Sequence, residues 1–217
     1  MGGHTLNTDG LSEIADSARD HFTAKHRARE EALALSRETV RFSANAIRCV
    51  HRREFPAAEE RIAKAAANLR QVDTGLADHR DIFHAGFVHD AQKEYVEACT
   101  TLAFIAGRPV PTPEDLDVLK AAYMNGIGET IGELRRHLLD SLREGEVEHC
   151  EDVLAAMGDI YDVMATMDFP EAITGGLRRT TDAMRSILER TRGDLTMAAV
   201  QRRLEQRLDE FGKRLGS

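Results

Sequence analysis

Apolar residues recur at helical spacing from the start of the chain, and the first helix that they predict is very long. Residues 11–53 contain no Gly or Pro, and Leu33, Val40, Ala44 and Ile47 form one apolar stripe. Spacings of three, four and seven residues are those of one face of an α-helix. A helix of about 40 residues must pack against partners along much of its length.

Breaks at Gly and Pro divide the rest of the chain into further amphipathic segments, and no stretch alternates as a strand would. We expect helices at residues 57–72, 84–106, 112–144 and 146–167, then one or two more between Pro170 and Leu215, with Thr112 as the cap of the fourth. The fold class is therefore all-α: a bundle of six or seven helices, in a single domain over residues 1–217, with residues 1–9 disordered.

The composition supports a helical protein and limits its partners. Pro is rare at five residues, Trp is absent, and the formal net charge is −8. Because a whole-protein nucleic-acid footprint would be basic, any nucleic-acid binding must be local and assisted by a metal. Three widely spaced cysteines without a Cys-x-x-Cys pair, and apolar runs far shorter than a bilayer needs, favour a cytoplasmic protein without a membrane partner.

Two acidic residues fall on a helical face that otherwise heads into the interior. Glu94 and Glu97 share one sector of the predicted third helix with Phe87 and Ile105. A buried carboxylate without a partner is costly, so it takes a proton or finds a cation. The spacing therefore marks these acids as candidate ligands of a cation.

A second acidic pair, Glu129 and Glu133, lies on the predicted fourth helix near Gly126, Gly128 and Gly132. A glycine cluster inside a helix usually means that a backbone or a ligand comes close. If the two helices are antiparallel neighbours, the four acids can meet, and all-oxygen ligation favours Mg²⁺ or Mn²⁺. Two alternatives stay open: the second pair can lie on a solvated face, and both pairs can simply bind Arg.

Basic residues supply candidate contacts to phosphate. One edge of the first helix carries a row of Arg with a neighbouring His, and a second group gathers before the third helix; the set is Arg37, Arg41, Arg48, His51, Arg52, His79, Arg80 and His84. Such rows can follow a phosphate backbone. A solvated helix face with partners such as Glu38, and ordinary surface histidines, explain the same pattern.

Several of these segments, in this order, resemble the translin/TRAX family. They are 35-LSRETVRFSANAIRCVHRREFPAAE-59, 92-QKEYVEA-98, 126-GIGETIGELRR-136, 158-GDIYDVMATMDFP-170 and 176-GLRRTTDAMRSILERTRGDLT-196, and the similarity runs from about residue 10 to about residue 196. The resemblance implies a bundle of about seven helices that assembles into a closed homo-oligomeric barrel of six to eight subunits. It also adds weight to RNA contacts by the basic residues.

Within that family the resemblance points to the TRAX-like catalytic branch, whose clustered acids form a metal-dependent endoribonuclease site. Glu94, Glu97 and Glu133 match the acids of its motifs, and Glu129 stands where Asp is usual. The resemblance implies that these four residues bind Mg²⁺ or Mn²⁺ and that the protein cleaves single-stranded RNA inside the barrel, with single-stranded DNA as a second candidate ligand.

Three rival interpretations remain. A translin-type shell would bind single-stranded nucleic acid without cutting it. An all-α nucleotide pyrophosphohydrolase would use similar acidic pairs to hold Mg²⁺ against a triphosphate, although such enzymes are generally shorter. A purely structural bundle would need no site.

Overall fold

The computed structural model describes residues 9–215, which form helices joined by short connections and, within that range, no strand. Six helices are long: α1 (Leu11–His51), α2 (Phe55–Gly75), α4 (Gly86–Ile105), α6 (Lys120–Glu144), α7 (Val147–Ala165) and α9 (Leu177–Leu215). Three are single turns: α3 (Arg80–Phe83), α5 (Pro113–Leu116) and α8 (Glu171–Thr174). The all-α class and the very long first helix are confirmed. The expected disorder of residues 1–9 falls, except for Asp9, outside the described residues.

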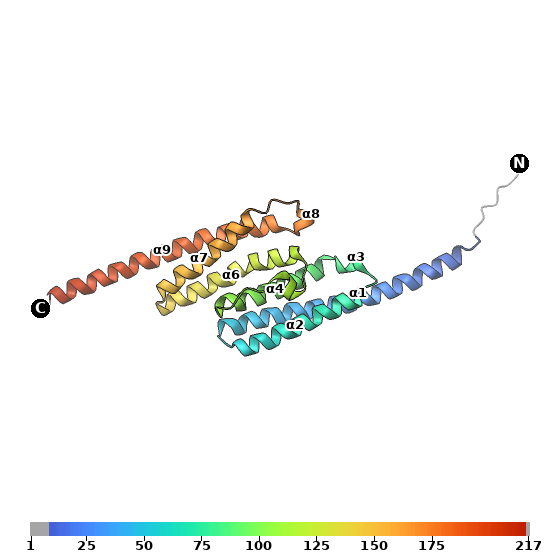
Figure 1. The fold of residues 1–217 in the computed structure, drawn as a ribbon, viewed down its shortest axis with the longest axis horizontal. Helices are drawn as coiled ribbons and strands as arrows, with labels where there is room; N and C mark the ends of the chain where they lie inside the picture. Colours follow the sequence, from blue (N-terminus) through green and yellow to red (C-terminus); the bar gives the residue numbers. More distant parts are fainter. Residues whose placement is uncertain (1–8, 216–217) are drawn as a thin grey trace.

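The long helices pack as two groups of three, α1 with α2 and α4, and α6 with α7 and α9 (Figure 1). The apolar stripe predicted for α1 is partly correct, since Ile47 is buried against Val50 and Leu102, whereas Val40 is only partly buried. In the second group Met157 and Met164 are fully buried beside Leu138. Each group therefore has an apolar centre of its own, and α4 and α6 form the boundary between them.

That boundary is close and partly polar. A Cβ built at Gly126 would lie 2.6 Å from the backbone oxygen of Lys93, so the backbones of α4 and α6 approach here as only glycine permits. The buried hydroxyls of Thr100 and Thr130 meet across the same boundary at 2.6 Å. Gly128 likewise lies against Thr180 of α9, whereas Gly132 faces open space. The close approach expected from the glycine cluster is thus present at two of the three positions.

The expected start of the fourth helix at Thr112 is wrong. Thr112 does form a capping box with Asp115, but the helix that it caps is the single turn α5. Asp117 then adopts the left-handed conformation, with φ of 51°, and α6 begins only at Lys120. A residue in that conformation cannot continue an α-helix, so the capping signal was correct and the length assigned to its helix was not.

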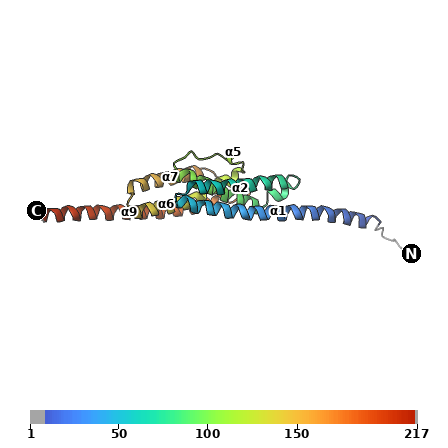
Figure 2. The same cartoon turned by 90° about the horizontal axis from the view of Figure 1, so that it is seen from below.

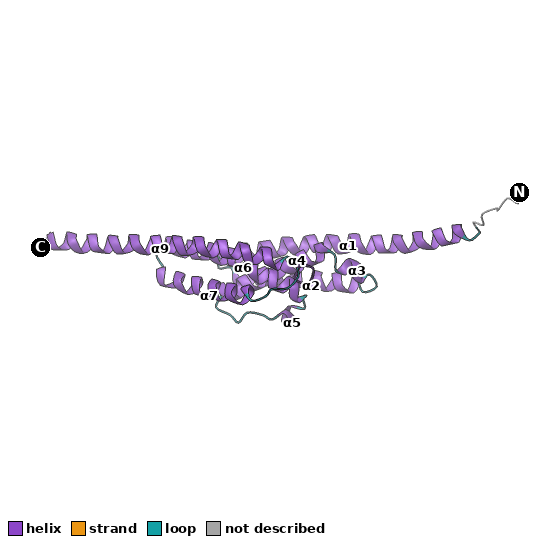
Figure 3. Ribbon diagram, turned by 90° about the horizontal axis from the view of Figure 1, so that it is seen from above, coloured by secondary structure: helices purple, strands orange, loops and turns teal. Residues whose placement is uncertain are grey.

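Both terminal helices extend well beyond the bundle, at opposite ends of the molecule (Figures 1, 2 and 3). Large apolar side chains toward the free ends of α1 and α9 are more than half exposed: Leu11, Ile14 and Phe22 on α1, and Met197, Val200, Leu204, Leu208 and Phe211 on α9. Within the described residues, no helix is long and apolar enough to cross a bilayer. These exposed side chains form apolar surfaces that the isolated chain leaves uncovered.

Candidate metal centre and nucleic-acid surface

Three of the four predicted acids meet at the boundary between α4 and α6. Glu94 and Glu97 come from α4 and Glu129 from α6, and one carboxylate oxygen from each lies within 4.8 Å of the other two. All three residues are partly buried. The close packing at Gly126, three residues before Glu129, brings the helices near enough for short carboxylate side chains to converge.

The fourth predicted acid, Glu133, is held by a histidine from the first helix. Its carboxylate lies 2.5 Å from Nε2 of His51 and 4.0 Å from the guanidinium of Arg136. The His51 side chain is only 5% exposed. His51, a predicted RNA contact, therefore lies inside the protein beside the acidic cluster and connects α1 to it. The solvated-face alternative for Glu129 and Glu133 does not describe this packing, because both side chains are partly buried.

The surroundings of the acids shift their pKa values in different directions. Burial first, and then the charges of Glu94, Glu129 and Glu133, raise the pKa of Glu97 to about 8. Burial and the charge of Glu129 also raise the pKa of Glu94. By contrast, the hydrogen bond from His51 lowers the pKa of Glu133. Without a bound cation, the centre of the cluster therefore retains a proton that an exposed carboxylate would have lost.

We expect the metal-free protein to lose stability as the pH rises from about 5 to about 8. The pKa of Glu97 is raised from its ordinary value of 4.5 to about 8, so between these values the folded state holds a proton that the unfolded state has released, and the free energy of unfolding falls with pH. Urea denaturation in EDTA at several pH values measures this slope. Glu97→Gln should flatten it, and an unchanged slope in that variant would contradict the assignment.

The donor set suits a hard divalent cation. Three partly buried carboxylates converge, two of them with a raised pKa, and each can supply an oxygen. Mg²⁺ and Mn²⁺ prefer a few carboxylates together with water and substrate phosphate, whereas structural zinc prefers Cys and His. The residues present therefore fit the cation that the sequence led us to expect.

The predicted basic row on α1 lies on an exposed edge of that helix. Arg37, Arg41, Arg48 and Arg52 are all exposed. Arg41 pairs with Glu38 at 2.6 Å, and Arg52 with Glu54 at 2.8 Å. The solvated-face alternative named Glu38 as a partner, whereas Glu54 lies beyond the end of α1. Contact of this row with RNA stays a prediction.

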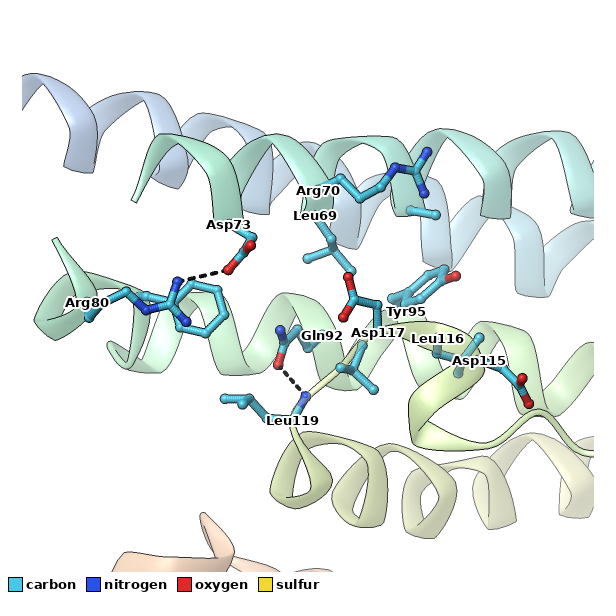
Figure 4. A pocket seen from close by; sticks show the side chains of 13 residues that line it. Leu69, Arg70, Asp73, Arg80, Gln92, Tyr95, Asp115, Leu116, Asp117 and Leu119 are labelled. Carbon is cyan, nitrogen blue, oxygen red and sulfur yellow. Dashed lines mark hydrogen bonds and ion pairs between the residues drawn. The ribbon is translucent and has the colours of Figure 1, made fainter. Parts of the chain in front are cut away.

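The second basic group surrounds α3, beyond the N-terminal end of α4. Arg80 stacks 3.9 Å from the ring centroid of Phe83 and pairs with Asp73 at 2.8 Å. It lines a cavity of about 260 Å³ between α2, α4 and the α5 segment (Figure 4). His84 is exposed beside Phe83, and His79 packs near His21. About 12 Å of helix separate the start of α4 from Glu94, so the structure does not bring this group into the acidic cluster.

Lys93 lies in the cluster although it was not among the predicted site residues. Its ammonium donates a hydrogen bond to Oε1 of Glu129 at 2.9 Å and so links α4 to α6 inside the cluster. The signal was available, because Lys93 directly precedes Glu94 and lies one helical turn before Glu97. A pair of histidines was also missed: Nε2 of His137 on α6 lies 3.0 Å from Nε2 of His149 on α7.

Comparison with known proteins gives no match to a family model. An uncharacterized protein of Methanocaldococcus jannaschii is 28% identical over 194 residues, which cover 87% of this chain and 84% of that protein. Among solved structures, apo-NeC3PO shares the fold, with a TM-score of 0.76 over 90% of this chain and 100% of its own, at 18% identity.

Two structures of AfC3PO share the fold and are more similar to this chain in sequence than apo-NeC3PO is. The crystal structure of AfC3PO has a TM-score of 0.78 at 34% identity, and its complex with duplex RNA has 0.75 at 33%. Each match covers 87% of this chain and 98% of AfC3PO. Because this similarity extends over nearly all of AfC3PO in both sequence and fold, the chain belongs to the family of translin/TRAX-like C3PO proteins.

Proposed function

We propose that this protein is a divalent-metal-dependent endoribonuclease of the TRAX-like catalytic branch, acting on single-stranded RNA. The observation that carries the proposal is the convergence of Glu94, Glu97 and Glu129 at the boundary of α4 and α6. Membership of the C3PO-like family and the duplex RNA in the AfC3PO complex support RNA as the ligand, and the preference for single strands is part of the proposal. The hydrolytic activity rests on the chemistry of the donor set.

Each acid has a distinct part in the proposed site. Glu94, Glu97 and Glu129 would hold Mg²⁺ or Mn²⁺, which supplies Lewis acidity toward a phosphodiester and a reactive water at neutral pH. Glu133 would complete the set from its position beside His51, which fixes its carboxylate. Glu97 must give up its proton before it can serve as a ligand, so occupancy of the site should increase as the pH approaches 8. Partial burial limits competing water around these groups.

The basic residues would bind the rest of the strand. We expect the exposed Arg37, Arg41, Arg48 and Arg52 on α1, with His79, Arg80 and His84 near α3, to neutralise backbone phosphates rather than to read bases. Such contacts are independent of sequence, and their contribution to affinity falls as salt rises.

We also propose a closed homo-oligomer of six to eight copies, located in the cytoplasm. The exposed apolar residues of α9 support self-association: Leu195 faces the core, and nine residues at about 100° each place Leu204 on the opposite side of the helix. An apolar stripe on that outward side needs a partner. An enclosed site would favour flexible single strands over duplexes. The three cysteines are free and buried, which suits a reducing compartment.

The direct test is cleavage of an end-labelled single-stranded RNA by the purified protein in Mg²⁺, in Mn²⁺ and in EDTA. We expect internal cuts with either metal and none in EDTA. A duplex of the same sequence should compete for binding but be cut more slowly.

The same preparation separates the rival functions. RNA bound tightly but left intact in both metals would support a translin-type binding shell instead. Release of pyrophosphate from nucleoside triphosphates without RNA cleavage would favour a pyrophosphohydrolase. If the protein neither bound RNA nor hydrolysed RNA or nucleotides, the bundle would have a purely structural role.

A further inference from the structure

Lys93 lies at the acidic cluster, although the proposed metal site gives it no role. Its Nζ donates to Glu129 across the helix boundary at 2.9 Å, and its side chain is 22% exposed. The charges of Glu129, Asp90 and Glu94 all act on the ammonium. A cation of this chain is therefore already in place where the protein would receive a divalent ion.

The position of Lys93 is fixed by the fold. Its backbone oxygen is the atom nearest to a Cβ built at Gly126, and Glu129 follows Gly126 by one helical turn. The residue also stands immediately before Glu94 and one turn before Glu97 on α4. Lys93 thus belongs to the same rigid helix as two of the acids, while its ammonium bonds the third.

This pair differs from an ordinary surface ion pair of the same chain. Lys64 and Glu60 are one turn apart on α2 and are 52% and 65% exposed, which is typical of a solvated contact of little net energy. Lys93 and Glu129 join two helices, are 22% and 35% exposed, and involve a carboxylate that also belongs to the triad of acids. The lysine therefore competes directly for a proposed metal ligand.

We propose that Lys93 is the resident counter-ion of the acidic site and that it exchanges partners during function. It neutralises Glu129 in the metal-free protein and opposes binding of a divalent cation at that carboxylate. Once Glu129 turns to the cation, the released ammonium binds a phosphate of the RNA beside the site. A lysine suits this exchange because its flexible stem ends in a compact charge with three donors, and phosphate is a common partner of that charge. The inference rests on the proposed nuclease function.

The test compares wild type with Lys93→Met in two measurements that should move in opposite directions. Calorimetric titration of the metal-free proteins with Mn²⁺, without RNA, should show about tenfold tighter binding in Lys93→Met, because an opposing charge has been removed at short range. Cleavage of single-stranded RNA at saturating Mn²⁺ should be at least about tenfold slower, because a phosphate contact is lost.

Two further variants keep the test decisive. Lys93→Arg retains the charge and should bind Mn²⁺ with nearly wild-type affinity, and the surface variant Lys64→Met should resemble wild type in both measurements.

Unchanged Mn²⁺ affinity, or unchanged cleavage, in a folded Lys93→Met protein would overturn the exchange while leaving the nuclease in place. If Lys93→Met does not fold, Lys93→Gln takes its place with the same expectations. No Mn²⁺ binding in wild type or in any variant would overturn the metal site itself, and the exchange with it.

Discussion

Glu97→Gln should abolish divalent-dependent RNA cleavage, with a loss of about 10²-fold or more, and should leave RNA binding nearly unchanged. Glu97 has the most strongly perturbed carboxyl of the cluster because burial and three neighbouring acids act on it together. The amide keeps the size of the side chain but removes the negative charge that a hard cation requires. Metal-assisted catalysis supplies several kcal/mol of transition-state stabilisation, which corresponds to this loss of rate.

Stability provides a second readout of the same substitution. Because Glu97→Gln removes repulsion within the cluster, the metal-free variant should unfold at a higher urea concentration than wild type near pH 8. Mn²⁺ should stabilise wild type but not the variant.

The matched control is Glu148→Gln, an exposed position in the first turn of α7, which should keep full activity. Activity that survives in Glu97→Gln would place the chemistry elsewhere or reveal a contaminating ribonuclease.

Gly126→Ala should cost both stability and activity, although it changes no charged or polar side chain. The added Cβ would lie 2.6 Å from the backbone oxygen of Lys93 and 2.7 Å from Cβ of Val96, so α6 must move away from α4. Overpacking of this kind costs about 1–3 kcal/mol, a fall that urea denaturation resolves. The same movement separates Glu129 from Glu94 and Glu97, so cleavage should fall more than the loss of folded protein explains.

Gly132→Ala is the matched control on the same helix. A Cβ at this position meets nothing within 4 Å, and Ala is a better helix former than Gly. We therefore expect a gain of up to about 1 kcal/mol in the free energy of unfolding and no change in cleavage. Equal destabilisation by both substitutions would show that helix geometry, rather than the contact at Gly126, limits stability. It would also remove the packing explanation for the convergence of the acids.

Local signals in the sequence were enough for the helices and for most of their ends. Gly145, in the left-handed conformation, ends α6. Pro56 is the second residue of α2 and marks the start of that helix. The one clear error, at Thr112, has a local cause. A capping box specifies where a helix starts but not how far it continues, and here Asp117 ends it after one turn. Nothing in the spacing of residues 112–120 separates one turn from a long helix.

By itself, the sequence determined the all-α class, the long first helix and the four candidate acids, because periodicity, helix breakers and short motifs are local properties of the chain. Only the tertiary structure decided which of these residues meet. The approach of α4 and α6 at Gly126 joins Glu129 to Glu94 and Glu97, and the packing of α1 gives Glu133 to His51. The tertiary structure also brings the ammonium of Lys93 on α4 to the carboxylate of Glu129 on α6. Contacts of this kind depend on the crossing angle and separation of two helices, which the packing of side chains from both helices sets, and residue spacing along one helix fixes neither.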